Sequence, residues 1–343
     1  MIYKIKDLCD INMVTLKNNH DLSYIDYLDT ANMNQGSIDT LQRLHIGVDS
    51  IPSRAKRVVR DNDILFSTVR PNQLHYGFIR NSNKNLICST GFAILSPKNN
   101  TIPYYLYKYL TQKHIIEYLQ GIAETSTSTY PSIKPSDIGE LEIDSPSLAE
   151  QKAIANILSS LDEKIELNNK ISKTLEEIAQ TLYKRWFVDF DFPNEDGEPY
   201  QSSGGEMVDS ELGLIPKSWI VYNFGTLFDF IKGKKPSEVI QSNHQSYIPY
   251  LTLAHITNDE TSYTLKSNIV PVTRFDTLMV MDGGSSGKVF YGQEGALGST
   301  MSLLRVKQSY HKMFVLQTSI ANSEKIQSRS EEHTSELQSR QVI

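Results

Sequence analysis

The sequence predicts an α+β protein: two similar domains of mixed strands and helices, joined by one long helix. Three observations predict this class. Short apolar runs separated by turn residues fill residues 1–146, one helical pattern begins at residue 147, and the strand pattern returns after residue 217. A chain of 343 residues is also long enough for two domains, each with its own core.

The composition excludes several classes of protein. Hydrophobic residues make up 39 % and charged residues 22 %, as in an ordinary folded protein. The two cysteines, Cys9 and Cys88, cannot form a disulfide framework, and no Cys/His cluster has zinc-ligand spacing. No run approaches the roughly 18 apolar residues of a membrane span, and the N-terminus lacks a signal-peptide pattern. We expect a cytoplasmic protein with no metal, no cofactor and no membrane contact.

Residues 1–146 form the first predicted domain. Strands are expected at 63–67, 76–79 and 91–95, because each is a short apolar run bounded by Asn, Pro or Gly. Residues 103–119 predict one helix, since apolar side chains recur there at helical spacing.

Residues 147–188 predict one long helix. Ser147-Leu-Ala-Glu150 is a capping box, and neither Gly nor Pro occurs between Ser147 and Phe192. At 1.5 Å per residue, such a helix is about 60 Å long. Its apolar seam consists of Ile154, Leu158, Leu161, Ile165, Ile171, Leu175, Ile178, Leu182 and Trp186.

This seam predicts an interface with another long helix. An apolar stripe is most often the core of its own domain, but one globular domain cannot cover a rod of about 60 Å. The partner is either the missing helix of a second repeat or a helix of another subunit. Asn168 lies on the seam where the spacing shortens, and a polar residue there would fix the register of a coiled coil. We expect the seam to be under-packed within one chain.

Residues 189–216 predict an acidic flexible linker. They contain eight Asp or Glu residues and no Lys or Arg, together with the Ser-Ser-Gly-Gly run at 202–205. The net charge of -6 therefore arises from this segment, and it does not argue against a polyanionic partner.

Residues 217–325 predict a partial second copy of the first domain, with strands at 219–222, 250–253 and 278–281. Four matches keep the same order in both halves: 7–11 with 226–230, 27–31 with 250–254, 63–66 with 276–279, and 89–95 with 299–305. After Leu304 no counterpart follows for the 125–130 loop or for the long helix. We therefore expect an incomplete second domain and no second long helix.

Residues 326–343 are expected to be a non-native tail. The string from Arg329 to Ser339 resembles a translated sequencing adapter, and a genuine polar tail is the alternative.

Catalytic motifs are missing from the sequence. There is no phosphate-binding loop of the Walker type, no Rossmann spacing, no zincin helix and no nucleophile elbow. The run Gly283-Gly-Ser-Ser-Gly287 could bind a phosphate through backbone N–H groups, although a hairpin turn explains it as well. We expect no catalytic residue.

The remaining features are those of nucleic-acid binding. Arg54, Lys56, Arg57 and Arg60 form a dense cationic run whose side chains could contact phosphates, and a solvated charged loop is the alternative. Three further groups are candidates. An Arg beside two amides could read base edges, and a salt bridge is the alternative for this Arg. A hydroxyl run could donate to phosphates, and cations of the second copy could contact them as well. These residues are Arg70, Asn72, Gln73, Ser126, Thr127, Lys234, Lys235 and Lys288.

Three motifs of the long helix resemble a known family. Residues 149–158, 161–168 and 182–190 resemble the central conserved region of the specificity subunit of type I restriction–modification enzymes. Residues 63–72 and 211–219 resemble parts of its two target-recognition domains. The resemblance extends from residue 1 to about residue 325, and it implies a specificity subunit truncated at its C-terminus.

The resemblance implies a non-catalytic reader of double-stranded DNA. Each target-recognition domain would bind one half of a bipartite site, and two antiparallel spacer helices would set the distance between the halves. Methyltransferase (modification) subunits would dock on the helical spacer, and the restriction subunit would join through them. Two alternatives stay open: these domains are the reader part of a fused methyltransferase or restriction endonuclease, or the chain is a coiled-coil scaffold that does not touch DNA.

Overall fold

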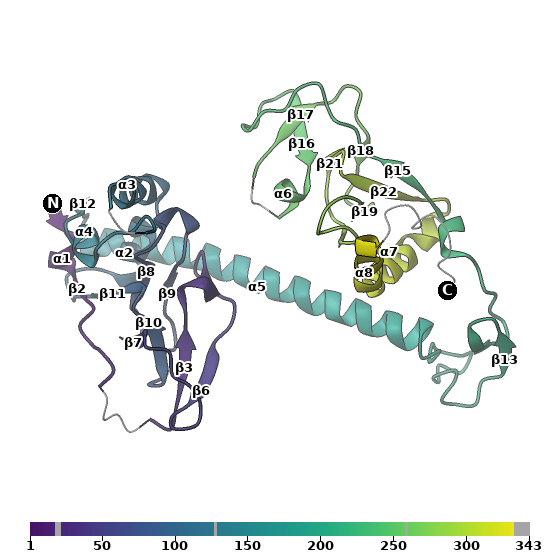
Figure 1. The fold of residues 1–343 in the computed structure, drawn as a ribbon, viewed down its shortest axis with the longest axis horizontal. Helices are drawn as coiled ribbons and strands as arrows, with labels where there is room; N and C mark the ends of the chain where they lie inside the picture. Colours follow the sequence, from purple (N-terminus) through teal and green to yellow (C-terminus); the bar gives the residue numbers. More distant parts are fainter. Residues whose placement is uncertain (18–21, 127–128, 258–259, 333–343) are drawn as a thin grey trace. The chain divides into compact units, whose positions relative to one another are not determined.

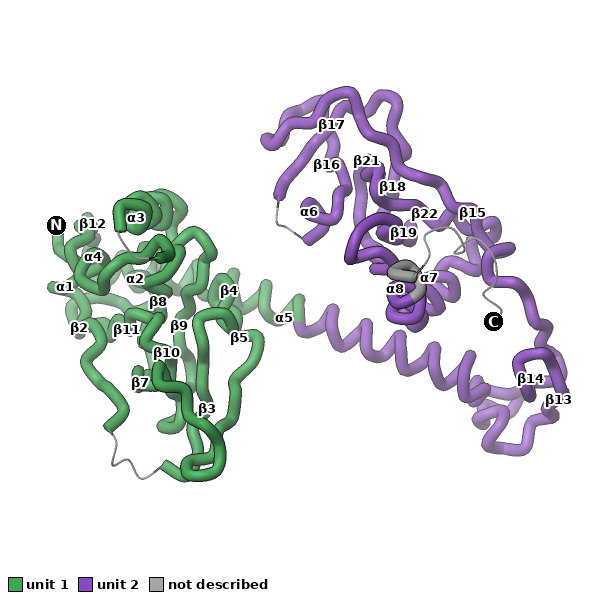
Figure 2. Tube along the Cα trace, in the orientation of Figure 1, with its two compact units in different colours: residues 1–169 green, residues 170–343 purple. Residues whose placement is uncertain are grey.

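The computed structural model describes residues 1–17, 22–126, 129–257 and 260–332 (Figure 1). The chain divides into two compact units, Met1–Asn169 and Lys170–Ile343, shown in Figure 2. The boundary lies inside the long helix α5 (Leu148–Phe187). Both units mix strands with helices, so the predicted α+β class with a long helix is confirmed.

The described residues of unit 1 form two four-stranded sheets. The first has the strand order β6-β3-β10-β7, with β3 parallel to β10. The second is antiparallel, with the order β2-β11-β8-β9. Two short pairs, β1 with β12 and β4 with β5, complete the unit. The strands are β1 (Ile2–Lys4), β2 (Cys9–Ile11), β3 (Tyr24–Leu28), β4 (Met33–Asn34), β5 (Ser37–Ile38), β6 (Gln42–His45), β7 (Ala55–Val58), β8 (Ile64–Ser67), β9 (Tyr76–Phe78), β10 (Leu86–Ser89), β11 (Phe92–Pro97) and β12 (Glu142–Asp144).

Strand β8 shows how the layers pack. All four of its residues are buried, as expected for a strand covered on both faces. Ile64 and Phe66 pack in a cluster with helical residues such as Leu106, whereas Leu65 packs with Leu28 of the first sheet. The second sheet therefore lies between the helices and the first sheet.

The single helix predicted at 103–119 is wrong, because the chain forms two helices there. The first helix ends at Leu110, and the backbone of Gln112 is extended (φ -67°, ψ 144°), which separates the two helices. The apolar spacing continues through this break and so conceals it. The short helices of unit 1 are α1 (Ile5–Leu8), α2 (Pro103–Leu110), α3 (Lys113–Glu124) and α4 (Pro135–Gly139), with 3₁₀ turns η1 (Thr30–Asn32) and η2 (Pro71–Gln73).

The start of α5 is fixed by the predicted capping box and by a buried glutamine. The Ser147 N–H donates to Glu150 Oε2 at 3.0 Å, and the Glu150 N–H donates back to Ser147 Oγ at 3.4 Å. Gln151 is 2 % exposed. Its oxygen accepts from the Ile102 N–H at 2.9 Å, and its amide nitrogen donates to Ser145 Oγ at 2.9 Å. Gln151 therefore joins α5 to the N-terminus of α2.

A second contact holds α5 against unit 1 about three turns later. Asp162 accepts hydrogen bonds from Lys108 Nζ at 2.5 Å and from the Tyr104 hydroxyl. Arg80 donates to Glu163 at 3.2 Å. These contacts lie beside the seam and leave its apolar side chains uncovered.

The segment 189–216 differs from the flexible linker that we expected. It contains a hairpin of β13 (Met207–Ser210) and β14 (Gly213–Pro216). Phe192 stacks between Tyr200 and Trp219, with ring centroids 4.8 and 5.2 Å apart. The Asp191 carboxylate accepts from the Ser202 hydroxyl at 2.7 Å. Aromatic packing thus gives local structure to a segment whose charges alone suggest a solvated chain.

Unit 2 repeats the strand order of unit 1. Its described residues form a sheet β15-β22-β19-β20, equivalent to β2-β11-β8-β9, and a sheet β17-β16-β21-β18, equivalent to β6-β3-β10-β7. The central pair β16–β21 is parallel, like β3–β10. The strands are β15 (Phe228–Lys232), β16 (Tyr247–Leu251), β17 (Tyr263–Leu265), β18 (Pro271–Val272), β19 (Thr277–Val280), β20 (Val289–Phe290), β21 (Gly295–Leu297) and β22 (Met301–Val306). The internal repeat predicted from four sequence matches is confirmed.

Two details of the second copy were predicted wrongly. Residues 219–222 form no strand, because Trp219 belongs to the aromatic cluster with Phe192. The boundary at residue 326 is also too early, since Ile326 is 5 % exposed and lies in a core cluster of unit 2. The helices here are α6 (Leu253–Ile256), α7 (Lys312–Ala321) and α8 (Ser323–Glu332), with η3 (Phe224–Thr226) and η4 (Ser309–His311).

Candidate nucleic-acid interface

Arg54 lies at the end of the second sheet where β11 begins. Its carbonyl accepts from the Thr90 N–H at 2.8 Å. A side chain on Gly91 would come within 2.6 Å of an Arg54 guanidinium nitrogen, so this guanidinium lies over the glycine. The Gly91 carbonyl in turn accepts from the Thr68 N–H at 2.8 Å, just beyond β8. The exposed Arg54 thus adjoins the loop that leaves β8.

That loop carries Arg70, Asn72 and Gln73. Arg70 has a left-handed backbone (φ 48°), and its guanidinium lies over the Tyr130 ring at 4.7 Å. The Asn72 N–H donates to Gln120 Oε1 of α3 at 3.2 Å, which supports the 3₁₀ turn η2 from behind. The side chains of Asn72 and Gln73 are exposed. The loop therefore presents a stacked guanidinium and two amides on a fixed backbone.

Ser126 belongs to the same end of unit 1. It lies beyond α3, and its hydroxyl is 3.3 Å from that of Ser132. Ser132 is bridged to Val69, next to Arg70. We name this region the loop surface, and it consists of Arg54, Thr68, Arg70, Asn72, Gln73, Ser126 and Tyr130. Thr127, which was predicted with Ser126, lies outside the described residues.

The run from Arg54 to Arg60 is not one cluster, contrary to our expectation. Lys56 is exposed on β7, whereas Arg57 is half-buried. The Arg57 backbone pairs with Thr15, and its Nε atom is buried with no hydrogen-bond partner among the described residues. Because β7 is extended, these side chains are spread along it rather than gathered.

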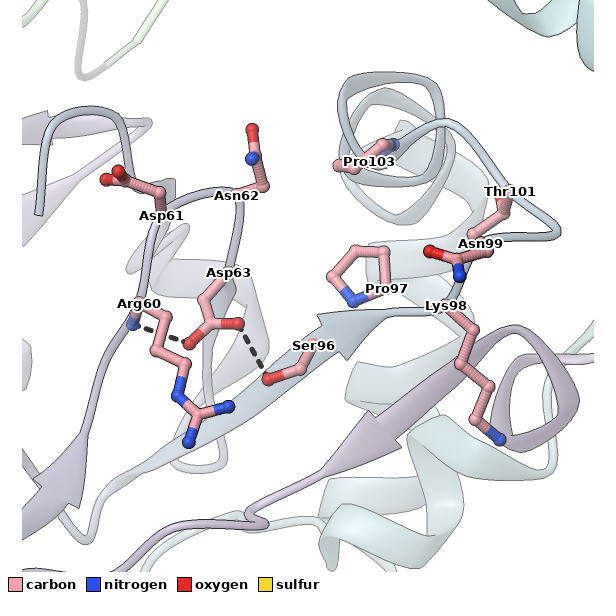
Figure 3. Close-up of a pocket in the computed structure, with 10 residues that line it drawn as sticks. All are labelled: Arg60, Asp61, Asn62, Asp63, Ser96, Pro97, Lys98, Asn99, Thr101 and Pro103. Atoms are coloured by element: carbon pink, nitrogen blue, oxygen red, sulfur yellow. Dashed lines mark hydrogen bonds between the residues drawn. The ribbon is translucent and has the colours of Figure 1, made fainter.

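Arg60 lies at the opposite end of β8 from Arg54. Its N–H donates at 2.8 Å to Asp63, which also accepts from the Ser96 hydroxyl at 2.6 Å (Figure 3). These residues and Lys98 line a cavity of about 450 Å³. Burial raises the pKa of the Asp63 carboxyl. Arg60 is thus separated from the loop surface by the length of β8, since β8 pairs Ile64 with Leu95 at one end and Ser67 with Phe92 at the other.

The three predicted lysines of unit 2 lie at one end of its antiparallel sheet. Lys234 and Lys235 follow β15. The end of β15 lies against the start of β22, since the Gly233 N–H donates to the Met301 carbonyl at 3.0 Å. Lys288 lies in the loop between β19 and β20, and the Met281 N–H joins that loop to Thr300 at 2.9 Å. All three lysines are exposed.

Only one of the three lysines, Lys288, lies in a loop whose counterpart in unit 1 carries candidate residues. Lys288 is in the β19–β20 loop, the counterpart of the β8–β9 loop with Arg70. Helix α8 supports the β19–β20 loop, with the Ser323 hydroxyl donating to the Gly287 carbonyl at 2.9 Å. Lys234 and Lys235 follow the counterpart of β2 instead of the counterpart of β7, so they do not correspond to Arg54 and its neighbours.

Sequence reasoning missed three features of the loop surface. Gly91 was part of a repeat match, yet its role in leaving room for Arg54 was not predicted. Thr68 and Tyr130 were also absent from the candidates. An aromatic residue at the end of the hydroxyl run before Pro131 was the available signal for Tyr130.

The partner-helix seam of α5 is exposed, as predicted. Eight of the nine seam side chains are between 36 % and 59 % exposed, and Leu158 is half-buried. Gln151 and Ala155 are the only buried residues of the helix. The other described helices have at most 12 residues, so the described part of the chain contains no second long helix.

Metal clusters and membrane-spanning helices are both missing from the described ranges. These residues contain no group of three His, Cys, Asp or Glu side chains arranged to hold a metal ion. None of their helices combines the length and apolar character needed to cross a bilayer.

The family model for the type I restriction modification DNA specificity domain matches residues 1–177, more than half of the chain. The chain belongs to this family. The match to the DNA specificity domain includes all of unit 1 and most of α5, and it therefore contains the loop surface and the greater part of the seam.

Two curated members of the specificity family are similar over two thirds of this chain. The type I restriction enzyme HindI specificity subunit of Haemophilus influenzae is 32 % identical over 66 % of the chain and 48 % of its own length. The MjaIX specificity subunit of Methanocaldococcus jannaschii is 30 % identical over 69 % of the chain and 51 % of its own length. The chain thus spans about half the length of these relatives.

One solved structure has a similar fold. The S subunit of a type I restriction–modification system from M. genitalium matches with a TM-score of 0.52 and 19 % identity. The alignment covers 97 % of this chain and 79 % of the other.

Proposed function

We propose that the chain is a sequence-specific DNA-recognition subunit of a type I restriction–modification complex. Each unit reads one half of a bipartite site in double-stranded DNA. The chain itself is non-catalytic, and methylation and cleavage belong to other subunits of the complex. Family membership supports this role, since the matched domain is a DNA specificity domain.

One observation carries the proposal. Unit 1 gathers Arg54, Arg70 and two amides at the loop end of its antiparallel sheet, and unit 2 gathers its lysines at the equivalent end of an equivalent sheet. Two copies of one scaffold with cations at the same end are suited to contact two stretches of the same polyanion. The net charge of -6 does not oppose this, because eight acidic residues are confined to 189–216.

The loop surface has suitable chemistry for reading DNA. Arginine can donate two hydrogen bonds to guanine, and the Asn and Gln amides can pair with adenine in the major groove. Stacking on Tyr130 holds the Arg70 guanidinium in one orientation, which suits it to such contacts. Ser126 supplies a hydroxyl donor for phosphate oxygens, whereas the Thr68 hydroxyl already donates to the Gly91 carbonyl at 2.9 Å. The support of η2 by α3 reduces the entropy lost on binding.

Helix α5 is the spacer in this proposal. Methyltransferase (modification) subunits dock on the helical spacer, and the restriction subunit joins through them. The complex acts in the cytoplasm, where it has access to double-stranded DNA. No cofactor binds to this chain in the proposal.

Substitution at the loop surface tests the proposal. We expect Arg54→Ala and Arg70→Ala each to weaken binding to a 30-base-pair duplex, because each removes a cation from the interface. The slope of log K against log salt should fall by about 0.9 for each phosphate that the variant no longer neutralises. Fluorescence anisotropy at four salt concentrations measures both quantities.

The control is Lys152→Ala, which removes an exposed cation of α5 outside the loop surface. It should leave the affinity and the slope unchanged. The proposal is wrong if both arginine variants bind with the affinity and salt dependence of the parent chain. The scaffold alternative predicts that no variant, including the parent, binds duplex DNA.

A further inference from the structure

The β8–β9 loop of unit 1 and the β19–β20 loop of unit 2 have the same length. The Ser67 N–H donates to the His75 carbonyl at 2.9 Å, and the Val280 N–H donates to the Lys288 carbonyl at the same distance. The strand pairs beside the two loops keep the same register. Residues 67–75 can therefore be matched one by one with residues 280–288.

The backbone of both loops is left-handed at the same two positions. These are Arg70 (φ 48°) and Leu74 (φ 59°) in unit 1, and Gly283 (φ 80°) and Gly287 (φ 89°) in unit 2. In each loop, the N–H of the residue three positions beyond the first of them donates back to the carbonyl of Arg70 or Gly283 at 2.9 Å. The two units thus build one loop conformation twice.

Arg70 occupies a position that unit 2 fills with glycine. A left-handed backbone strains residues that have a β-carbon, and glycine adopts it without cost. Eight described residues other than glycine have a positive φ, and four of them are Asn, which tolerates this conformation. Because Gly283 supports the same turn, the fold of the loop does not require an arginine. Strained residues that the fold does not require are concentrated at functional sites.

Both loops are supported by a helix that packs behind them. In unit 1, Gln120 of α3 accepts from the Asn72 N–H at 3.2 Å. In unit 2, Gln327 of α8 donates to the Gly284 carbonyl at 3.0 Å. Each of these helices is the second to follow the last strand of its unit's antiparallel sheet. The two loops therefore differ in their side chains and not in their support.

The unit 2 loop lacks counterparts for the three candidate base readers of unit 1. At the equivalent positions it has Gly283, Ser285 and Ser286. A β-carbon on Gly283 would meet no atom within 4 Å, so the space for a side chain is open there. Ser286 is 5 % exposed, and its hydroxyl donates to the Met281 carbonyl at 3.1 Å. Ser285 is half-buried, and a serine hydroxyl does not distinguish one base from another.

The exposed cation of the unit 2 loop is suited to phosphate. Lys288 matches His75, and its ammonium is a point charge without the fork that pairs with guanine. Contacts of this kind position a protein on DNA and carry no sequence information. Asp282, the exposed acid of this loop, matches Val69, which is not one of the base readers.

We propose that the two equivalent loops read DNA unequally. Arg70 requires a guanine in the half-site of unit 1, whereas the base pair that faces Gly283 in the other half-site is not discriminated. In unit 2 the loop contacts DNA through phosphates, with Lys288 as the cation. This assignment rests on the DNA-recognition role proposed above.

Exchange of the two residues between the loops tests the assignment. The full chain selects duplexes from a random pool, and sequencing of the bound fraction gives the preference at each position. We expect the parent to prefer one guanine about 10-fold over other bases through Arg70. Arg70→Gly should reduce this preference below about 3-fold and leave the remaining positions as in the parent. Gly283→Arg should gain a guanine preference of about 10-fold in the other half-site.

Gly283→Ala is the matched control for the added arginine. It places a β-carbon on the same left-handed backbone without a guanidinium, so it should gain no base preference. Circular dichroism and urea unfolding verify that the variants fold. If Gly283→Arg does not fold, the loss of one guanine preference in Arg70→Gly decides the question.

Lys288→Ala tests the phosphate contact separately. It should lower the slope of log K against log salt by about 0.9 and leave the selected sequence unchanged. A change in base preference in this variant contradicts the proposal.

Failure of this inference is distinguishable from failure of the proposed function. A parent chain that selects no duplex overturns the DNA-recognition role, and the inference with it. A parent that selects a sequence, together with an Arg70→Gly chain that keeps every preference of the parent, overturns the inference alone. A folded Gly283→Arg chain without a new guanine preference does so as well.

Discussion

At the residue scale, the separation of Arg54 from Arg60 follows from the geometry of β7. An extended chain advances about 3.3 Å per residue, so six residues carry the two side chains roughly 20 Å apart. The sequence showed a dense run of charge. Only the pairing of β7 in the first sheet and of β8 in the second shows that the run extends from one end of β8 to the other. Local loops were more predictable: Arg70, Asn72 and Gln73 share one loop as expected.

Contacts between distant residues explain what was missed. Tyr130 lies 60 positions beyond Arg70, and no spacing rule joins them. The same holds for Gly91 beneath Arg54. Such pairs depend on how β8, β11 and the segment after α3 meet, which is a property of the packed domain.

Asp26 provides a test of electrostatics at this scale. It is 4 % exposed and accepts from Arg43 Nε at 2.9 Å and from Asn83 at 3.3 Å. The hydrogen bond from Arg43 holds the pKa of Asp26 below its ordinary value. A depressed carboxyl pKa stabilises the fold above the unfolded pKa of about 3.9, and this stabilisation is lost as the pH falls through the folded pKa.

We therefore expect Asp26→Asn to lower the free energy of unfolding at pH 7 by roughly 1.5–3 kcal/mol. The difference from the parent should shrink below pH 4 and disappear as the pH falls through the depressed folded pKa of Asp26, because protonation removes the charge that Arg43 binds. Urea unfolding at pH 7, 5 and 3 measures this. Asp39→Asn, the same change at an exposed carboxylate, is the control. A difference that is the same at all three pH values would show that the Asp26 charge is not responsible.

At the scale of elements, α5 was predicted almost to the residue and the α2–α3 pair was not. The start of α5 carries a local signal, the Ser147–Glu150 box, and no Gly or Pro interrupts the helix. The break at Gln112 carries no such signal, because its cause is the packing of two short helices on one sheet. The hairpin β13–β14 was missed for a similar reason, since aromatic contacts order a segment whose composition is that of a linker.

Gln151 tests how α5 is attached. Its side chain uses both amide ends in the interior, and Gln151→Met keeps the volume while leaving the Ile102 N–H and Ser145 hydroxyl unpaired. We expect a loss of about 2–4 kcal/mol in the free energy of unfolding, seen as a lower urea midpoint at unchanged slope. Gln180→Met, on the exposed part of the same helix, should cost less than about 0.5 kcal/mol. Equal midpoints for the two variants would exclude a structural role for the Gln151 hydrogen bonds.

At the scale of the whole molecule, each unit has its own core. The three buried clusters of unit 1 lie between Ile5 and Ile143, and the two of unit 2 lie between Phe224 and Ile326. The repeat could be detected in the sequence because four short matches kept their order. The sequence did not reveal that two helices follow the last strand in both units. Helices α7 and α8 follow β22 as α2 and α3 follow β11, but their sequences are not similar.

Independent cores predict that residues 1–177 fold alone. This fragment keeps every core cluster of unit 1 together with the Gln151 contacts. We expect one cooperative urea transition and DNA binding that still depends on Arg54. A fragment ending at residue 147 lacks Gln151 and should unfold at a lower urea concentration. An aggregated or non-cooperative 1–177 fragment would show that unit 1 needs the rest of the chain.

The sparse burial of α5 also determines where the molecule opens first. With Gln151 and Ala155 as its only buried residues, the middle of the helix is held by backbone hydrogen bonds and by contacts along one flank. Helices without a covered apolar face are marginally stable in water, and their amide protons exchange through local unfolding long before the core opens. Whatever covers the seam must therefore also stop this fraying. Part of the binding free energy is therefore spent on suppressing local unfolding of α5. Only a covered helix stays straight enough to hold its two ends at a fixed separation.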